Sequence, residues 1–356
     1  MESSRSRIQN RFSGGTPVSS AEALGQSEIF LDFQERLSRV APINRPVLIL
    51  GERGTGKELA ASRLHYLSQR WQGPFVALNC SALAASLIES ELFGYEKGAF
   101  TGADQRRLGR FEAAHNGTLL LDEIGNIPME VQEKILRVVE YNTFERVGGS
   151  QSVEVDVRII AATNANLKIL AANGVFKQDL LDRLSFEVLF LPPLRERRED
   201  ILLLANHFAG RMAVELGWDE IPHFGPEAAD ALERYPWPGN VRELKNVVER
   251  AVYRSEGLLI SSIDFDPFYS PFEDPIDQTQ KQVLKSEQKP DQLDHLMNQP
   301  LKQAVWDLKV RMLENALRES RYNQRKAANL LGMTYHQFRG LYRQYQKTAS
   351  GDNEDT

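Results

Sequence analysis

Short apolar runs alternate with helix-like segments in the first half of the chain. The runs are VLILG (47–51), FVALNC (75–80), TLLLDE (118–123) and VRIIAATN (157–164). Runs that are apolar along their whole length are typical of strands buried on both faces of a sheet. Because helical patterns lie between them, the sequence predicts βαβ units and a parallel sheet, and thus an α/β fold.

After about residue 195 the strand pattern stops, and three segments with helical periodicity follow: 198–213, 226–235 and 240–255. At the start of the last segment, Asn240 is expected to cap the helix and Glu243 to complete a capping box. A small helical lid domain at 195–263 is therefore expected after an α/β subdomain at 21–194.

Three further segments lack the pattern of a folded domain. Residues 1–20 are rich in Ser, Gly, Arg and Asn, and we expect a disordered tail. Residues 264–300 carry 5 prolines among polar residues, which predicts a linker. Residues 348–356 are expected to form a second tail.

The overall charge hides a local excess of basic residues. The 356 residues carry a net charge of -6, which does not favour nucleic-acid binding by the chain as a whole. Residues 301–347, however, contain 10 Lys or Arg and only 3 Asp or Glu. A small DNA-binding domain is therefore expected there.

Within that basic segment, residues 323–345 predict two short helices joined at Gly332, in the pattern of a helix-turn-helix. The second helix would enter the major groove, and flanking basic residues would contact phosphates. The expected DNA contacts are Thr334, Tyr335, His336, Gln337 and Arg339 on or next to that helix, and Arg325, Lys326 and Arg343 at phosphates. Helix 301–319 is expected to pair with its copy in a dimer. A helical hairpin that binds protein is the alternative.

Composition excludes several classes of protein. The single cysteine, Cys80, cannot form an internal disulfide. No signal-peptide pattern and no apolar run of membrane-spanning length is found. We therefore expect a cytoplasmic protein that does not insert into membranes.

A glycine-rich segment, GERGTGKE, follows the first predicted strand and precedes a helical pattern. Its GxxxxGK spacing predicts a P-loop, in which backbone N–H groups surround the phosphates of ATP and Lys57 reaches the β- and γ-phosphates. Glu58 stands where the general motif has Ser or Thr for magnesium. The candidate nucleotide-binding residues are Gly51, Glu52, Arg53, Gly54, Thr55, Gly56, Lys57 and Glu58. A glycine-rich surface turn is the alternative, which the strand–loop–helix context disfavours.

The run TLLLDE ends in two acids, at the expected carboxyl end of a parallel strand, where ligands bind in open α/β sheets. Asp122 would hold Mg²⁺ directly or through water, and Glu123 would polarise the attacking water. The alternative is a solvated turn, and the P-loop earlier in the chain argues against it.

These motifs together resemble the AAA+ domain of bacterial enhancer-binding proteins, which activate RNA polymerase carrying sigma-54. The resemblance rests on GERGTGKE, LNCSAL, ESELFGYEKGAFTGA, GTLLLDEI, ATN, DLLDRLSFEV, LPPLRERRED and YPWPGNVREL. They cover most of residues 20–260, and the family commonly has Glu at the position of Glu58. The C-terminal unit resembles the DNA-binding end of the Fis protein. The resemblance implies an AAA+ P-loop ATPase with a parallel sheet, a helical lid and an all-α helix-turn-helix domain.

GAFTGA is the most specific of these motifs, because other AAA+ branches lack it. In the family it tips a loop inserted into a helix of the α/β domain, and it contacts sigma-54. That implies contacts for Gly98, Ala99, Phe100, Thr101, Gly102 and Ala103, with the exposed Phe100 as an anchor. A second insertion near 141–150 would support the loop.

The resemblance also implies roles around the γ-phosphate. Asn79 would link Glu123 to the nucleotide state, Asn164 would be the sensor beside the γ-phosphate, and Arg242 would be the sensor on the lid.

Arginine fingers come from the neighbouring subunit of a hexameric ring in this family, and the matching positions here are Arg183 and Lys177. Lysine lacks the planar fork of the arginine that is common at the second position. Either Lys177 substitutes for it, or Arg183 carries the contact alone. An ordinary surface lysine is a third interpretation of Lys177.

Because no receiver or sensor pattern precedes residue 20, the chain looks most like the activators of phage-shock (membrane-stress) operons. These are controlled in trans by an inhibitory phage-shock protein, for which the resemblance suggests Trp71 as a contact. A half-buried tryptophan packed on a loop is the alternative for that residue.

The expected function is the ATP-driven remodelling of sigma-54 RNA polymerase closed promoter complexes by a homo-hexamer bound at enhancer DNA, with ATP and Mg²⁺ as cofactors. A AAA+ DNA motor or unfoldase is one alternative. A repressor whose ATP site only controls its oligomeric state is the other. An intact GAFTGA argues against both.

Overall fold

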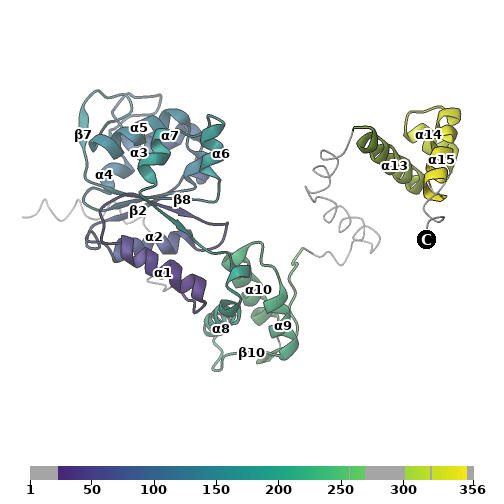
Figure 1. Cartoon of the computed structure of the whole chain (residues 1–356). Helices are drawn as coiled ribbons and strands as arrows, with labels where there is room; N and C mark the ends of the chain where they lie inside the picture. The colour runs from purple at the N-terminus through teal and green to yellow at the C-terminus, as the bar shows by residue number, and fades with distance from the viewer. Residues whose placement is uncertain (1–22, 256, 269–300, 321–322, 351–356) are drawn as a thin grey trace, which may run out of the picture. The chain divides into compact units, whose positions relative to one another are not determined.

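The computed structural model describes residues 23–255, 257–268, 301–320 and 323–350 (Figure 1). The predicted tail at 1–20, residues 269–300 of the predicted linker and residues 351–356 of the second tail lie outside the described residues. The chain forms two compact units, Met1–Pro267 and Phe268–Thr356.

A five-stranded parallel sheet forms the centre of the first unit, in the order β2-β5-β8-β1-β9. Its strands are β1 (Val47–Leu50), β2 (Phe75–Asn79), β5 (Thr118–Asp122), β8 (Arg158–Thr163) and β9 (Glu187–Phe190). The four apolar runs are strands of this sheet, as predicted. The edge strand β9 was missed because Glu187 and the exposed Phe190 interrupt its apolar pattern.

Helices cover both faces of the sheet (Figure 1). On one face lie α1 (Glu28–Val40) and α2 (Lys57–Tyr66). On the other lie α3 (Ala85–Phe93), α4 (Arg110–Ala113), α5 (Met129–Tyr141), α6 (Leu167–Ala172) and α7 (Gln178–Leu184). Strand β5 shows why its run is apolar throughout: Leu119 and Leu121 pack into one core and Leu120 into the other. Short 3₁₀ helices are η1 (Cys80–Ala82), η2 (Ile124–Asn126) and η3 (Leu194–Glu196).

Two small insertions project from the α/β subdomain. The first lies between α3 and α4 and contains the antiparallel pair β3 (Gly94–Tyr95) and β4 (Arg107–Leu108). The second is the hairpin of β6 (Thr143–Glu145) and β7 (Ser152–Glu154). A bridge between Tyr95 and Val147 joins the two insertions.

The lid consists mainly of α8 (Arg198–Glu215), α9 (Pro226–Arg234) and α10 (Asn240–Arg254). These helices enclose a core that contains the fully buried Trp237. The prediction that strands stop near residue 195 is wrong in one detail, because β10 (His223–Phe224) pairs with β11 (Leu259–Ile260). Strands of two residues are too short to leave a periodic pattern.

The predicted cap of α10 is also wrong. Gly239 is the N-cap residue, and Asn240 is the first residue of the helix, with φ of 53°. Glu243 accepts a hydrogen bond from Gly239 N at 2.8 Å. Its carboxylate therefore binds the backbone of the N-cap residue as in a capping box, but that residue is Gly239 and not Asn240. The side chain of Asn240 makes other contacts, which are described below.

A buried ion pair fastens the segment before α1 to the lid. Arg197 and Asp200 lie 2.7 Å apart and are almost fully buried. Asp200 also accepts hydrogen bonds from Gln26 N and from Ser27 N and Oγ. Burial alone would raise the pKa of Asp200, but these donors together with Arg197 outweigh it and hold the pKa below its ordinary value.

We expect Asp200→Ala to lower the free energy of unfolding by about 3–5 kcal/mol, because it leaves Arg197 buried without its partner. Since the pKa of Asp200 is lowered by folding, its contribution is present above the ordinary carboxyl pKa and is lost as the pH falls through the folded-state value. Denaturant unfolding measures both effects. Asp230→Ala, which removes an exposed ion pair with Arg234, is the control and should cost about 1 kcal/mol or less.

The second unit consists of α13 (Leu301–Glu319), α14 (Gln324–Leu330) and α15 (Tyr335–Ser350). Its core is formed by Leu313, Ala316, Leu317, Ala327, Ala328 and Phe338. The Asn323 side chain caps α14 by accepting hydrogen bonds from two backbone N–H groups. Gly332 has φ of 64°, the left-handed conformation that is expected of a glycine that ends the first helix of the pair. None of the described helices of the chain is both long and apolar enough to cross a membrane.

Candidate functional sites

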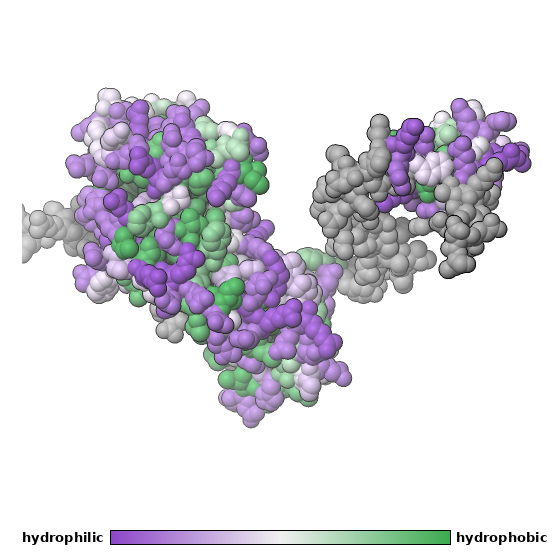
Figure 2. Space-filling model, viewed as in Figure 1, coloured by the Kyte–Doolittle hydropathy of each residue, from purple (hydrophilic) through white to green (hydrophobic). Residues whose placement is uncertain are grey.

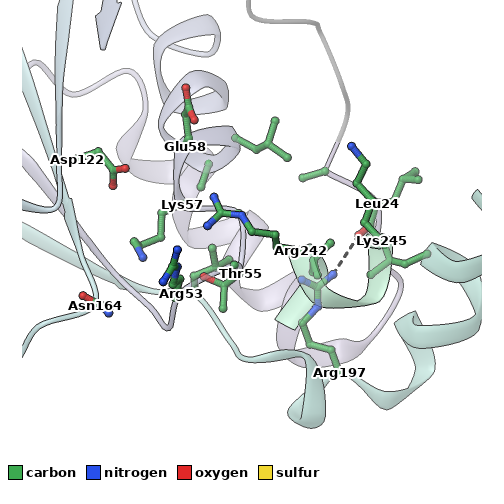
Figure 3. Close-up of a pocket in the computed structure, with 18 of the residues that line it drawn as sticks. Leu24, Arg53, Thr55, Lys57, Glu58, Asp122, Asn164, Arg197, Arg242 and Lys245 are labelled. Carbon is green, nitrogen blue, oxygen red and sulfur yellow. Dashed lines mark hydrogen bonds between the residues drawn. The ribbon is translucent and has the colours of Figure 1, made fainter. Parts of the chain in front are cut away.

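A cavity of about 930 Å³ lies where the P-loop, the carboxyl ends of the strands and the lid meet. Figure 3 shows Arg53, Lys57, Asp122 and Asn164 on the α/β side of this cavity and Arg242 and Lys245 on the lid side. The residues from Arg53 to Glu58 all line it, whereas Gly51 and Glu52 do not. The volume is in the range of pockets that enclose small-molecule ligands.

The P-loop is held in shape by its glycines and by Lys57. Gly54 has φ of +81°, and a Cβ atom there would lie 2.2 Å from the carbonyl oxygen of Gly239 in the lid. The Lys57 ammonium donates to the Gly51 oxygen at 3.1 Å and lies 3.6 Å from a Glu123 carboxylate oxygen. Lys57 is only 7% exposed, so its ammonium needs hydrogen-bond partners within the protein. The phosphate oxygens of a bound nucleotide would take the place of these partners.

The two acids at the end of β5 differ in their surroundings. Burial, followed by the charge of Glu123, raises the pKa of Asp122. Glu123 has φ of 53°, a left-handed conformation that is unfavourable for this residue type and is often found at functional sites. One of its carboxylate oxygens lies 3.4 Å from both Thr163 Oγ1 and Asn164 N.

Asn79 contacts Asp122 rather than Glu123. Its Nδ2 donates to Asp122 Oδ2 at 3.1 Å, and its Oδ1 accepts from Ser81 N at 2.9 Å. The reason is register, because Asn79 and Asp122 are paired residues at the ends of β2 and β5. In this structure Asn79 therefore binds the neighbouring acid, and it lines the cavity; its expected link between Glu123 and the nucleotide state stays a prediction.

The surroundings of Asp122 suit a magnesium ion that is bound together with a nucleotide. Burial, followed by the charge of Glu123, disfavours the ionised form of Asp122 and raises its pKa, and a divalent cation would offset both effects. Within the described ranges, no group of three His, Cys, Asp or Glu side chains could hold a metal ion. Magnesium usually takes one or two carboxylates and completes its octahedron with phosphates and water.

The predicted sensors and fingers lie in different places. Asn164 and Arg242 line the cavity, whereas Arg183 and Lys177 do not. Arg183 is 60% exposed and pairs with Glu140 on α5 at 2.9 Å. Lys177 pairs with Glu133 on the same helix at 2.8 Å.

Sequence reasoning missed the far end of the cavity. Apolar residues from the segment before α1, from α1 and from α8 line it there: Ala23, Leu24, Phe30, Phe33, Leu204 and Phe208. The lid adds His207, Arg211 and Lys245. No local pattern marks these residues, because they come together only when the lid packs against the segment before α1.

The GAFTGA loop is a compact turn with an exposed tip. Gly98 N donates to Ala103 O at 2.8 Å, and both Gly98 and Gly102 have φ above +80°. Phe100 is 46% exposed, and its ring contacts that of Tyr95 edge-on at 4.9 Å between centroids. Ala103 was expected to contact sigma-54, but it is buried in this conformation, where it supports the turn.

The second insertion contacts this loop, as predicted. Arg146, which is 5% exposed, pairs with Glu96 at 2.9 Å and with Glu112 at 2.6 Å. A Cβ atom at Gly148 would lie 2.6 Å from Ala99 Cβ. The insertion therefore connects the loop to α4.

Trp71 is 56% exposed, which leaves part of its ring open to a partner and is equally compatible with the half-buried alternative. Tyr66 and Leu67, at the end of α2 five and four residues earlier in the chain, are also exposed. Figure 2 shows a mostly hydrophilic surface with scattered apolar areas on the face that it presents.

All predicted DNA contacts are exposed on the second unit: Arg325, Lys326, Thr334, Tyr335, His336, Gln337, Arg339 and Arg343. Thr334 and Gln337 exchange hydrogen bonds at the start of α15. The Arg325 guanidinium lies 5.7 Å from the centre of the Tyr335 ring. The start of α15 thus presents polar and basic groups, as helices that read the major groove do.

Comparisons with protein families match three consecutive parts of the chain. Residues 23–189 match the Sigma-54 interaction domain, 195–282 match the AAA+ ATPase lid domain, and 305–343 match the Bacterial regulatory protein, Fis family. These matches follow the order of the elements described above.

Similar proteins and structures agree with these matches. The chain is 52% identical to the Psp operon transcriptional activator of Escherichia coli (strain K12) over 326 residues, which are 91% of this chain and 97% of that protein. It is 51% identical to Regulatory protein AtoC of the same organism over 68% of this chain, and it spans only 53% of that protein. The structure resembles NtrX from Brucella abortus in complex with ATP, with a TM-score of 0.64 and 34% identity over 92% of this chain and 69% of the other.

The family matches and the similarity to curated proteins indicate the same kind of protein, and the P-loop cavity fits its ATPase domain. The matched domains together make up an ATPase domain that interacts with sigma-54, its lid and a domain that binds DNA. The chain therefore belongs to the family of sigma-54-dependent transcriptional activators, and it is a nucleotide-binding AAA+ ATPase with a Fis-type helix-turn-helix.

Proposed function

We propose that the chain hydrolyses Mg-ATP in the P-loop cavity and uses this energy to remodel sigma-54 closed promoter complexes through the GAFTGA tip. The observation that carries the proposal is the exposed Phe100 and Thr101, presented on a loop that joins α3 to α4 beside the ATPase core. Such a tip has no role in nucleotide binding, since it does not line the cavity.

Within the cavity, each proposed residue has a separate task. The P-loop and Lys57 bind the phosphates, and Asp122 holds the magnesium that neutralises their charge. Glu123 orients and polarises the attacking water. Asn164 and Arg242 contact the γ-phosphate from the sheet and from the lid, so its loss would alter contacts on both sides.

Catalysis in this proposal needs a second subunit. Arg183 and Lys177 lie outside the cavity of their own chain and are exposed enough to enter that of a neighbour. We propose a homo-hexameric ring in which Arg183 contacts the transferring phosphoryl group in trans, while Lys177 adds charge. Exposed apolar side chains on α1 and the lid provide surface for such contacts: Ile29, Leu31, Val214, Ile221 and Leu259.

The second unit is proposed to bind an enhancer upstream of the promoter. The start of α15 would read bases, and Arg325, Lys326 and Arg343 would contact phosphates. The exposed apolar residues Val305 and Met312 on α13 support the expectation that this helix pairs with its copy.

The high identity to the Psp operon transcriptional activator supports a role in activating a phage-shock operon. We propose that a separate inhibitory protein acts at the exposed Trp71.

The proposed function is tested by a complex with sigma-54 in Mg-ADP-aluminium fluoride, which stands in for the transferring γ-phosphoryl group. We expect the wild type to form a stable complex on native gels and Thr101→Ala to form none, while its ATPase activity remains. Ser86→Ala, which removes an exposed hydroxyl from α3, is the matched control and should bind normally. An active wild-type ATPase without any complex would overturn the sigma-54 assignment and favour a DNA motor.

A further inference from the structure

One buried side chain joins the P-loop to the lid. Asn240 is fully buried at the start of α10, in a left-handed conformation. Its Nδ2 donates to Glu52 Oε2 at 3.1 Å and to Arg53 O at 3.0 Å. Its Oδ1 accepts from Leu194 N at 2.8 Å. A single amide on the lid therefore contacts both the P-loop and the connection between the subdomains.

A second contact orients the carboxylate that Asn240 uses. Glu52 forms a bidentate pair with Arg195, with distances of 2.6 Å and 2.8 Å. The Arg195 guanidinium, with the amide of Asn240, holds the pKa of Glu52 below its ordinary value. Both side chains of the pair are more than 40% exposed, so the pair adds little stability by itself. Its effect is to fix where the Glu52 acceptor lies.

Arg242 lies close to this joint. It follows Asn240 by two residues on α10, and its N–H donates to Gly54 O at 3.2 Å. The carbonyl of Gly239 lies so close to Gly54 that a side chain there would clash. Since the P-loop and α10 meet without space between them, a shift of the joint displaces Arg242 relative to the cavity.

We infer that Asn240 and Glu52 are positioning residues that hold α10 against the P-loop and thereby keep Arg242 over the γ-phosphate of bound ATP. Neither residue lines the cavity, so neither reaches the nucleotide directly. This role replaces the nucleotide contact expected for Glu52. The inference rests on the proposed function, in which Arg242 senses the γ-phosphate.

The test is whether Asn240 acts through Arg242. Asn240→Asp keeps the size of the side chain and the tolerance of a left-handed conformation, but it places a carboxylate against Glu52. We expect its affinity for ATP to fall about tenfold relative to its affinity for ADP, as the loss of a buried hydrogen bond allows. Arg242→Ala should lose the same discrimination, and the double variant should be no worse than Arg242→Ala alone.

The outcomes separate this inference from the proposed function. If Arg242→Ala binds ATP and ADP as the wild type does, its sensor role fails and the inference fails with it. If Arg242→Ala is impaired but Asn240→Asp is not, or if their effects add in the double variant, only the positioning role is overturned.

Two further variants complete the design. Should Asn240→Asp fail to fold, Glu52→Ala removes the acceptor from a partly exposed position. It should also reduce the preference for ATP over ADP, and an unchanged preference would overturn the inference. Arg36→Gln is the matched control, because it removes an ion pair of similar length and exposure between α1 and β9. It should leave both affinities unchanged.

Discussion

Glu123→Gln is expected to lower ATP turnover by about 10²–10⁴-fold while nucleotide binding is retained. The amide keeps the shape of the side chain but can no longer polarise the attacking water. Lys57 lies 3.6 Å from the carboxylate, so removing the negative charge also leaves the ammonium freer to bind phosphates. Phosphate release measures turnover, and equilibrium binding of a fluorescent ATP analogue measures affinity.

Glu35→Gln is the control for this experiment, because it changes an exposed acid on α1 that pairs only with its helical neighbour Arg39 in the part of the chain described. It should leave turnover unchanged. Wild-type turnover in Glu123→Gln would contradict the assignment and would require another group to activate the water. Loss of nucleotide binding in Glu123→Gln would instead indicate a role in holding the P-loop.

Arg183→Ala is expected to lower turnover by about 10³–10⁵-fold, the range found for arginine fingers. The side chain lies outside the cavity of its own subunit, so the effect should arise in a neighbour. Mixing Arg183→Ala with Glu123→Gln tests this directly. A subunit with an intact Glu123 can then meet a neighbour with an intact Arg183, so two nearly inactive proteins should together regain activity.

Arg36→Gln is the control, because Arg36 takes no part in the proposed contact between subunits. This variant should hydrolyse ATP at the wild-type rate. If the two inactive variants do not restore activity although they assemble together, Arg183 does not act between subunits. A decline in the specific ATPase activity on dilution should accompany the restored activity, because the catalytic site is then shared between chains.

The sequence predicted the sheet and the P-loop well because both depend on local chemistry. The three central residues of β5 must be apolar because helices cover both faces of the sheet. The glycine spacing of the P-loop follows from the close approach of its backbone to phosphates. Asn240 was misassigned because capping preferences are statistical, whereas its position depends on contacts with Glu52 and Leu194 far away in sequence.

The apolar end of the cavity and the contact made by Asn79 could not be predicted for a related reason. Phe30 and Leu204 share no motif, and only the packing of the lid brings them together. The partner of Asn79 was set by the register of β2 and β5, which a motif does not specify. The fingers could be named from resemblance, but their distance from the cavity is a property of the folded chain.

The placement of β5 has a mechanical consequence. Asp122 and Glu123 stand at the end of a strand held by neighbours on both sides and by two cores, so that their base is stiff. The GAFTGA tip stands on strands of two residues, with no atom within 4 Å of where a side chain at Gly98 or Gly102 would begin. The open space at these two glycines leaves room for the tip to change its conformation, whereas the end of β5 has no such room.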